Sequence, residues 1–188
     1  MSPIRPILLG AALATGLLAA PAGAAERCPP PEERAEDRDR LLDALAGAET
    51  EAEGRALGDA LRHLWAEAPD ARAQALIDRV FERRRAYDFA AAEEAARALV
   101  AYCPDFAEGW NQLATVLFER GRLDASLDVI PKVLALEPKH FGALSGRALI
   151  LMRQGRARLG QKALREALAV HPWLAERGML IEVPGEDL

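Results

Sequence analysis

Histidines and cysteines are the side chains in this 188-residue sequence with the clearest capacity for metal binding or catalysis. His63, His140 and His171 lie far apart in the sequence, and none of them belongs to a His-Glu-x-x-His zinc pattern. His140 and His171 each lie beside a predicted turn between helices, where a histidine usually has a structural role. No Cys-x-x-Cys occurs, so the sequence offers neither paired zinc ligands nor a thiol oxidoreductase motif. We therefore predict no metal site and no cofactor.

Two further patterns resemble catalytic motifs without completing them. Gly155 and Gly160, followed by Gln161 and Lys162, resemble a phosphate-binding loop, but Gln stands where that motif has Lys and no Ser or Thr follows. Ser145 does not have glycines at two residues on each side, which a nucleophile elbow requires. The sequence thus predicts no catalytic residue and favours a protein that binds rather than catalyses.

The two cysteines that remain in the predicted mature chain are Cys28 and Cys103. In an oxidising compartment an isolated pair of cysteines usually forms a disulfide, and two free buried thiols are the alternative. A Cys28–Cys103 bridge would close a loop of about 75 residues, which stabilises the fold by about 4–5 kcal/mol in the chain-entropy model. It would also attach the Pro-rich arm, residues 25–33, to the end of a helix.

The N-terminus has the features of a secretory signal peptide, which we place at residues 1–24. Arg5 supplies the positive charge, residues 7–20 form an uncharged apolar run, and Ala22-Gly23-Ala24 offers the small residues that signal peptidase requires. The run is shorter than the roughly 20 residues of a membrane-spanning helix, although an uncleaved anchor is the alternative. Cys28 lies too late for a lipoprotein signal. The sequence predicts cleavage and export to a periplasm.

Composition favours helices and argues against nucleic-acid binding. The chain is 51% hydrophobic but only 5% aromatic, and much of the apolar content is Ala and Leu, which are strong helix formers. The net charge is −5, and it becomes −6 when Arg5 leaves with the signal peptide. A nucleic-acid-binding protein usually has a basic surface, so the short run Arg83 to Arg85 is interpreted as a solvated helix face. The mature chain has no second apolar run that could span a membrane.

The strongest pattern in the sequence is a period of 34 residues. Pro104, Pro138 and Pro172 are spaced by this distance, where Pro fits the junction between one helix and the next. Gly121 and Gly155 repeat it at predicted tight turns, which favour Gly because φ is positive there, and Tyr87 occupies the equivalent place one period earlier. Two registers of small residues follow the same period: Ala92, Ser126 and Gly160 form one, and Val80, Ala114 and Ala148 the other.

With its Trp110, Leu113, Gly121, Ser126 and Pro138, the sequence resembles the tetratricopeptide repeat (TPR). The resemblance is closest for residues 107–140, fair for 141–174 and weak for 73–106. It implies an all-α fold, a right-handed α-solenoid of antiparallel helix pairs, with a TPR-like array over residues 69–174. Residues 34–68 are predicted to form a divergent N-terminal helix pair, and 175–188 a C-terminal tail. The layout is also similar to small exported TPR proteins of Gram-negative bacteria.

In TPR arrays the first helix of each pair lines a concave groove that binds a protein or peptide partner. The resemblance places groove positions on three predicted helices. Amides among them could pair with an extended backbone, small residues leave one wall bare, and arginines could meet an acidic partner. The predicted partner-binding residues are Arg84, Arg85, Asn111, Gln112, Thr115, Phe118, Glu119, Ser145, Leu149, Met152 and Arg153.

The predicted function is a non-catalytic periplasmic scaffold, and two alternatives stay open. One is a structural subunit of a cell-envelope assembly that uses its outer face or open end, and the other is an enzyme. Three structural expectations accompany the repeat. Trp110 and Leu113 should be buried between helix pairs, Pro131 should lie on an outer helix face or bend its helix, and the apolar Met179 to Ile181 should fold back over the last pair.

Overall fold

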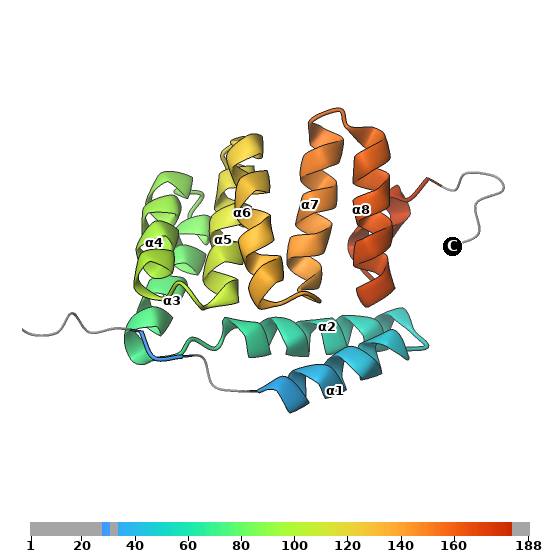
Figure 1. Cartoon of the computed structure of the whole chain (residues 1–188), viewed down its shortest axis with the longest axis horizontal. Coiled ribbons are helices and arrows are strands. Elements are labelled where there is room, and N and C mark those ends of the chain that lie inside the picture. Colours follow the sequence, from blue (N-terminus) through green and yellow to red (C-terminus); the bar gives the residue numbers. More distant parts are fainter. Residues whose placement is uncertain (1–27, 31–33, 182–188) are drawn as a thin grey trace, which may run out of the picture.

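A computed structural model describes residues 28–30 and 34–181, and the predicted signal peptide lies outside these residues. The described residues form eight α-helices and one short 3-10 helix, without strands. None of these helices has the length and apolar character needed to cross a membrane. The predicted all-α fold of antiparallel helix pairs is confirmed (Figure 1). The helices are α1 (Ala35–Ala46), α2 (Glu51–Ala66), α3 (Ala71–Arg85), α4 (Phe89–Tyr102), α5 (Ala107–Glu119), α6 (Leu123–Leu136), α7 (Phe141–Arg153), α8 (Ala157–Val170) and η1 (Ala175–Met179).

Polar side chains determine where several helices begin. The side chains of Thr50, Asp70 and Asp88 accept hydrogen bonds from backbone N–H groups in the first turns of α2, α3 and α4. His140 does the same for α7 through its imidazole. These caps satisfy donors that the first turn of a helix otherwise leaves without a partner.

Helices α3 to α8 stack as three antiparallel pairs, and the 34-residue period corresponds to their packing (Figure 1). Gly121 and Gly155 occupy the turn within their pairs with φ of 73° and 76°, and Tyr87 takes the same left-handed conformation with φ of 57°. The small-residue register lets paired helices approach closely. Ser126 is fully buried, and its hydroxyl donates to the Ala114 carbonyl at 2.6 Å.

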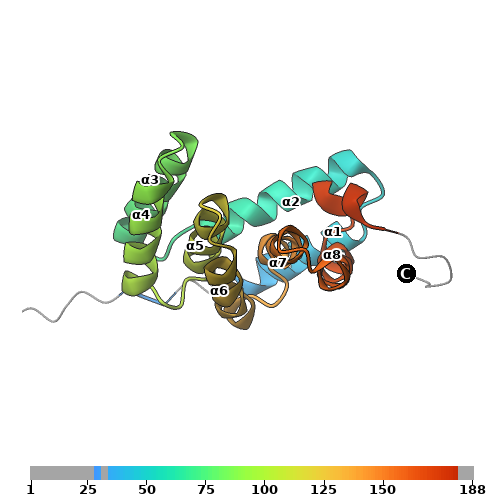
Figure 2. The same cartoon turned by 90° about the horizontal axis from the view of Figure 1, so that it is seen from above.

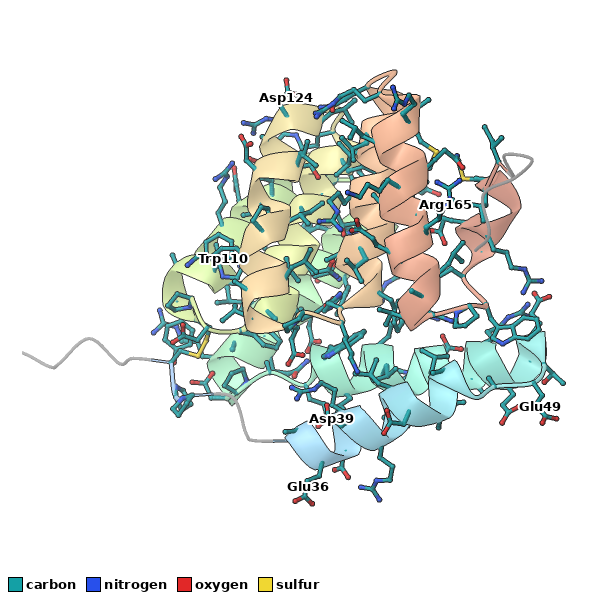
Figure 3. The ribbon with its side chains drawn as sticks, turned by 45° about the vertical axis from the view of Figure 1, so that its right-hand side comes forward. Glu36, Asp39, Glu49, Trp110, Asp124 and Arg165 are labelled. Carbon is teal, nitrogen blue, oxygen red and sulfur yellow. A yellow bond between two sulfur atoms is a disulfide. The ribbon has the colours of Figure 1, made fainter. Side chains whose placement is uncertain are left out.

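The prediction of burial is confirmed for Leu113 and wrong for Trp110. Leu113 is 3% exposed in a cluster with Val80 and Val116, whereas Trp110 is only partly buried at the edge of that cluster. Figure 3 shows Trp110 on the outside of the array. The physical reason is the indole N–H, which needs an acceptor and donates to the Pro104 carbonyl at 2.8 Å.

Pro131 is exposed, and α6 continues through it from Leu123 to Leu136. The position agrees with the expectation of an outer helix face. A proline there removes one backbone hydrogen bond on the solvent side without ending the helix.

The α1–α2 hairpin does not stack as a fourth layer but runs across the ends of the later helices (Figure 1). Its Leu45, Leu61 and Trp65 form an apolar cluster with Phe141 of α7 and Ala167 of α8. Figure 2 shows α2 along the side of the array on which α5 and α7 lie. The hairpin therefore adds a floor to the inner face of the repeats.

Both ends of the described chain are attached to the array. Cys28 forms a disulfide with Cys103 at the end of α4, with 5.1 Å between the two Cα atoms, which confirms the predicted bridge. At the other end, the Gln161 side chain holds the chain with two hydrogen bonds. Its amide N–H donates to the Met179 carbonyl at 2.9 Å, and its amide oxygen accepts from the Ile181 N–H at 2.7 Å. Residues 179–181 thus lie against α8, and the rest of the predicted tail, residues 182–188, is outside the described residues.

Candidate functional site

One hollow is a trough of about 600 Å³ between α2 and the inner ends of α3, α5 and α7. Along α2 the lining residues recur every three or four positions, which puts them on one helix face. At one end the trough is closed by the segment that begins at Trp173, whose indole N–H donates to the Ala48 carbonyl at 3.0 Å. The residues that α2 contributes are Glu51, Arg55, Asp59, Arg62 and Ala66.

A second hollow, a slot of about 250 Å³, lies between α5 and α7. Its walls are mostly small or apolar, with Ile130 and Ile150 among them. Asn111, Gly142 and Ser145 line both the trough and the slot, so the two hollows are contiguous. We call them together the inner groove.

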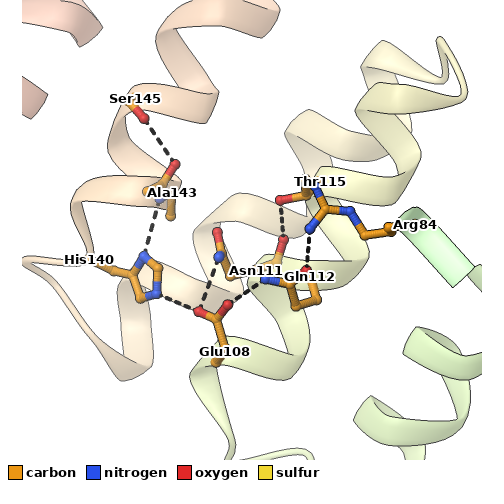
Figure 4. Close-up of polar contacts among 9 residues, drawn as sticks. Arg84, Glu108, Asn111, Gln112, Thr115, His140, Ala143 and Ser145 are labelled. Carbon is orange, nitrogen blue, oxygen red and sulfur yellow. Dashed lines mark hydrogen bonds and ion pairs between the residues drawn. The ribbon is translucent and has the colours of Figure 1, made fainter. Parts of the chain in front are cut away.

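A buried carboxylate organises the junction of the two hollows (Figure 4). Glu108 is 7% exposed, and its oxygens accept from Asn111 at 3.1 Å, Gln112 at 2.5 Å and His140 Nε2 at 2.9 Å. His140 Nδ1 accepts from the Ala143 N–H at 3.2 Å, so the ring proton is on Nε2 and donates to Glu108. Hydrogen bonds to an ionised acceptor stabilise a buried carboxylate, and the bond from His140 to Glu108 joins the N-terminal ends of α5 and α7.

Helix α2 supports this junction from below. The Trp65 ring stacks on the His140 imidazole with 4.1 Å between centroids and contacts Phe141 at 5.0 Å. Because Trp65 and His140 are both buried, the position of the His140 ring depends on the α1–α2 hairpin.

Arg84 joins α3 to α5 and is already occupied. Its guanidinium donates to both carboxylate oxygens of Glu119, at 2.9 and 2.6 Å, and to the Gln112 side chain at 2.8 Å. The planar fork of an arginine suits such a bidentate contact. Arg84, Gln112 and Glu119 therefore hold the groove wall in place, and the first two are less available to a partner than the sequence implied.

The remaining predicted groove residues divide into those at the slot and those away from it. Thr115, Phe118 and Leu149 line the slot, and the Thr115 hydroxyl donates to the Asn111 carbonyl at 2.8 Å. Arg153 is exposed and stacks on the Phe118 ring at 5.1 Å. Met152 instead packs against α8, where its sulfur lies 3.7 Å from the Gln161 amide.

Arg85, the last predicted groove residue, is exposed and lines neither hollow. Conversely, the sequence interpretation missed the face of α2 that carries Arg55, Asp59 and Arg62. A signal was present, because two glycines four residues apart, Gly54 and Gly58, are unusual inside a helix and indicate close packing.

His171 lies at the floor of the trough, where burial and, next, the charge of Arg62 lower its pKa to about 4. Its Nδ1 faces the Trp173 N–H at 3.3 Å, and the imidazole packs edge-on against Phe141. The ring is therefore neutral at pH 7 and acts as a packing group. Over the described residues, no three His, Cys, Asp or Glu side chains gather so that they could hold a metal ion.

Comparison with known proteins supports a repeat protein. No model of a protein family matches the chain. A segment of 73 residues, 39% of the chain, is 45% identical to a TPR repeat-containing protein of Rhizobium etli. The match spans only 36% of that relative.

Two solved structures share the fold at lower sequence identity. The K341M mutant of Thermobaculum terrenum O-GlcNAc transferase matches 54% of this chain and 20% of its own, with a TM-score of 0.52 and 24% identity. The TPR2B domain of yeast Sti1, solved in complex with pHsp70, matches 58% of this chain and 86% of its own, with a TM-score of 0.51 and 16% identity. The chain thus resembles tetratricopeptide-repeat proteins in its 34-residue period, in its stacked helix pairs and in the sequence of one 73-residue segment.

Proposed function

We propose that this protein is an adaptor that binds a protein or peptide partner in the inner groove. The observation that carries the proposal is the continuity of the polar trough with the apolar slot at Asn111, Gly142 and Ser145. A bound segment could make polar contacts along α2 while it buries an apolar side chain between α5 and α7. Interfaces of this kind combine a small apolar anchor with a polar surround.

We also propose that the adaptor works in a periplasm after removal of residues 1–24. The sequence of the N-terminus supports export, and the Cys28–Cys103 disulfide fits an oxidising compartment. The partner would then be another exported or envelope protein.

Site-specific photo-crosslinking in intact cells tests the groove. A photoreactive residue at position 149 lies at the slot, and one at position 159 on the exposed outer side of α8 is the matched control. We expect a discrete adduct from position 149 that position 159 does not give. Adducts from position 159 alone would contradict binding in the groove.

A second candidate function is a structural subunit held through the outer end of the array. Residues 141–170 contain six basic residues and one acidic residue, although the whole chain has a net charge of −5. Leu159, Met179 and Ile181 are 47%, 46% and 62% exposed at this end. This function predicts self-association or a stable complex in light scattering that persists when slot residues are changed.

A further inference from the structure

We infer that the slot between α5 and α7 binds one apolar side chain of the partner, and that Arg153, beside the slot on the Phe118 ring, recognises an adjacent anionic group. The inference rests on the proposed adaptor function and gives the chemistry of the segment that the groove takes. It depends on three observations, namely the glycine at position 146, the walls of the slot and the charges around Phe118.

Gly146 is the first observation, because packing does not explain it. It lies inside α7, where glycine is less favourable than alanine by about 1 kcal/mol, and its helical backbone needs no positive φ. A Cβ at this position would meet no atom within 4 Å, since it would project into the slot. Gly160 differs, because a Cβ there would lie 2.4 Å from Met152 Cγ. A glycine that the fold does not require, on the wall of a hollow, is explained by space left for a ligand.

The second observation is the character of the walls. Ala114, Ala143, Ile130 and Ile150 present aliphatic surface to the slot, and the Ser126 hydroxyl is already used by the Ala114 carbonyl. Few polar groups of the slot therefore remain without a partner inside the protein. Such a hollow favours an apolar side chain, whose removal from water contributes about 25 cal/mol for each Å² buried.

The third observation is a cation beside the slot, over the ring of Phe118, which lines it. Glu119 lines the slot but is neutralised by Arg84. Arg153 stacks on Phe118 of the same wall, and within the described part of the chain it forms no ion pair with a carboxylate. The guanidinium therefore complements an anionic group, such as a side-chain or terminal carboxylate next to the apolar residue.

Two small aromatic probes of similar length and opposite charge test the apolar part and the anionic part of the inference. We would titrate the purified protein with 4-phenylbutyrate and with 4-phenylbutylamine and follow the backbone amides of Gly142, Gly146 and Leu149 by NMR. We expect both probes to shift these amides and the carboxylate to bind about two- to fivefold more tightly, as for an exposed ion pair.

Variants identify the residues responsible. Gly146→Leu fills the slot and should weaken both probes by at least about tenfold, while Gly146→Ala, which adds one methyl group, should give a smaller loss. Arg153→Gln should abolish the preference for the carboxylate, and Arg158→Gln on the exposed side of α8 should keep it. Melting curves of all four variants show whether each remains folded.

Three results would overturn part or all of the inference. Unchanged binding by folded Gly146→Leu or Gly146→Ala, or no shift at the three amides, would exclude the slot. Equal affinity of wild type for both probes would exclude the anionic part. If the probes fail while position 149 still gives a crosslinked partner, this inference is wrong and the adaptor function stands.

Discussion

Tyr87 occupies the turn position of the 34-residue period at which the next two helix pairs have glycine. Its φ of 57° is the left-handed conformation that Gly121 and Gly155 adopt at the same place in the next two pairs. A side chain with a Cβ pays roughly 1–2 kcal/mol for this conformation. Tyr87 is 81% exposed, and its ring contacts Phe89 edge-on at 6.0 Å.

We expect Tyr87→Gly to stabilise the protein by about 0.5–1 kcal/mol, because relief at the backbone exceeds the lost contact and the larger unfolded-state entropy of glycine. Chemical denaturation measures the change in the free energy of unfolding. The matched control is Gly121→Tyr, which should destabilise the protein at the corresponding turn. A loss of stability in Tyr87→Gly would mean that the contact with Phe89 matters more than the backbone.

His171 makes the stability depend on pH. Its folded pKa is about 4, below the 6.5 of an unperturbed histidine, so between these values the unfolded chain binds a proton that the folded chain does not. Its contribution is fully present above pH 6.5, decreases as the pH falls and is lost below about pH 4. The total is at most about 3 kcal/mol.

His171→Asn, which keeps an acceptor near the Trp173 N–H, should reduce the loss of unfolding free energy between pH 7 and pH 4. His63→Asn, on the exposed face of α2, is the control for the histidine-to-asparagine change itself. Equal pH profiles for wild type and His171→Asn would show that this histidine does not titrate in the expected window.

At the scale of elements, helix α2 contains two glycines that its packing against the end of the array requires. Gly54 and Gly58 are buried inside it, and a Cβ on either would collide with the chain that follows α8. At residue 54 this atom would lie 2.3 Å from Trp173 Cδ1, and at residue 58 it would lie 2.7 Å from His171 Nε2. The two glycines allow α2 to reach the end of the array and close the trough.

Gly54→Ala should therefore destabilise the protein by about 1–3 kcal/mol through overpacking, although the same change in an open helix stabilises. Gly146→Ala in α7 is the matched control, and we expect it to gain up to about 1 kcal/mol because its Cβ meets open space. Thermal or urea unfolding of both variants gives the comparison. Two changes of the same sign would mean that α2 does not pack on Trp173 in this way.

At the scale of the whole molecule, the N-terminal segment ties the two ends of a repeat array together. Repeats in a solenoid usually contact only their neighbours. Here Cys28 is joined to the end of α4, and the hairpin that follows reaches η1, where Arg177 pairs with Glu51 at 2.8 Å. The disulfide and the Arg177–Glu51 ion pair thus hold the α1–α2 hairpin, which is the floor of the inner groove, against the helices that form its walls.

Replacing Cys28 by serine should lower the free energy of unfolding by about 2–5 kcal/mol, because the bridge constrains a long loop in the unfolded chain. Urea unfolding with and without reductant checks this. The reductant should destabilise wild type and have no effect on the variant. A wild-type protein that is insensitive to complete reduction would contradict the role of the bridge.

The sequence by itself determined the repeating part of this protein. The 34-residue spacing of Pro104, Pro138 and Pro172, with Gly121 and Gly155, predicted the helix pairs because turn and junction residues act locally. It also indicated which helices line the groove, and Thr115, Phe118 and Leu149 do lie at the slot. The pairing of the two cysteines followed from their number.

Only the tertiary structure decided how the ends of the chain close the groove and which polar residues of the groove stay available to a partner. The path of α2, the burial of Glu108 with His140, and the use of Arg84 by Glu119 join residues that are distant in sequence. Trp110 and Met152 depart from their predicted places through shorter-range contacts, with the Pro104 carbonyl and with Gln161 of α8. Local periodicity specifies each helix and its inward face, whereas contacts between non-neighbouring helices depend on which buried polar groups find partners across the assembled fold.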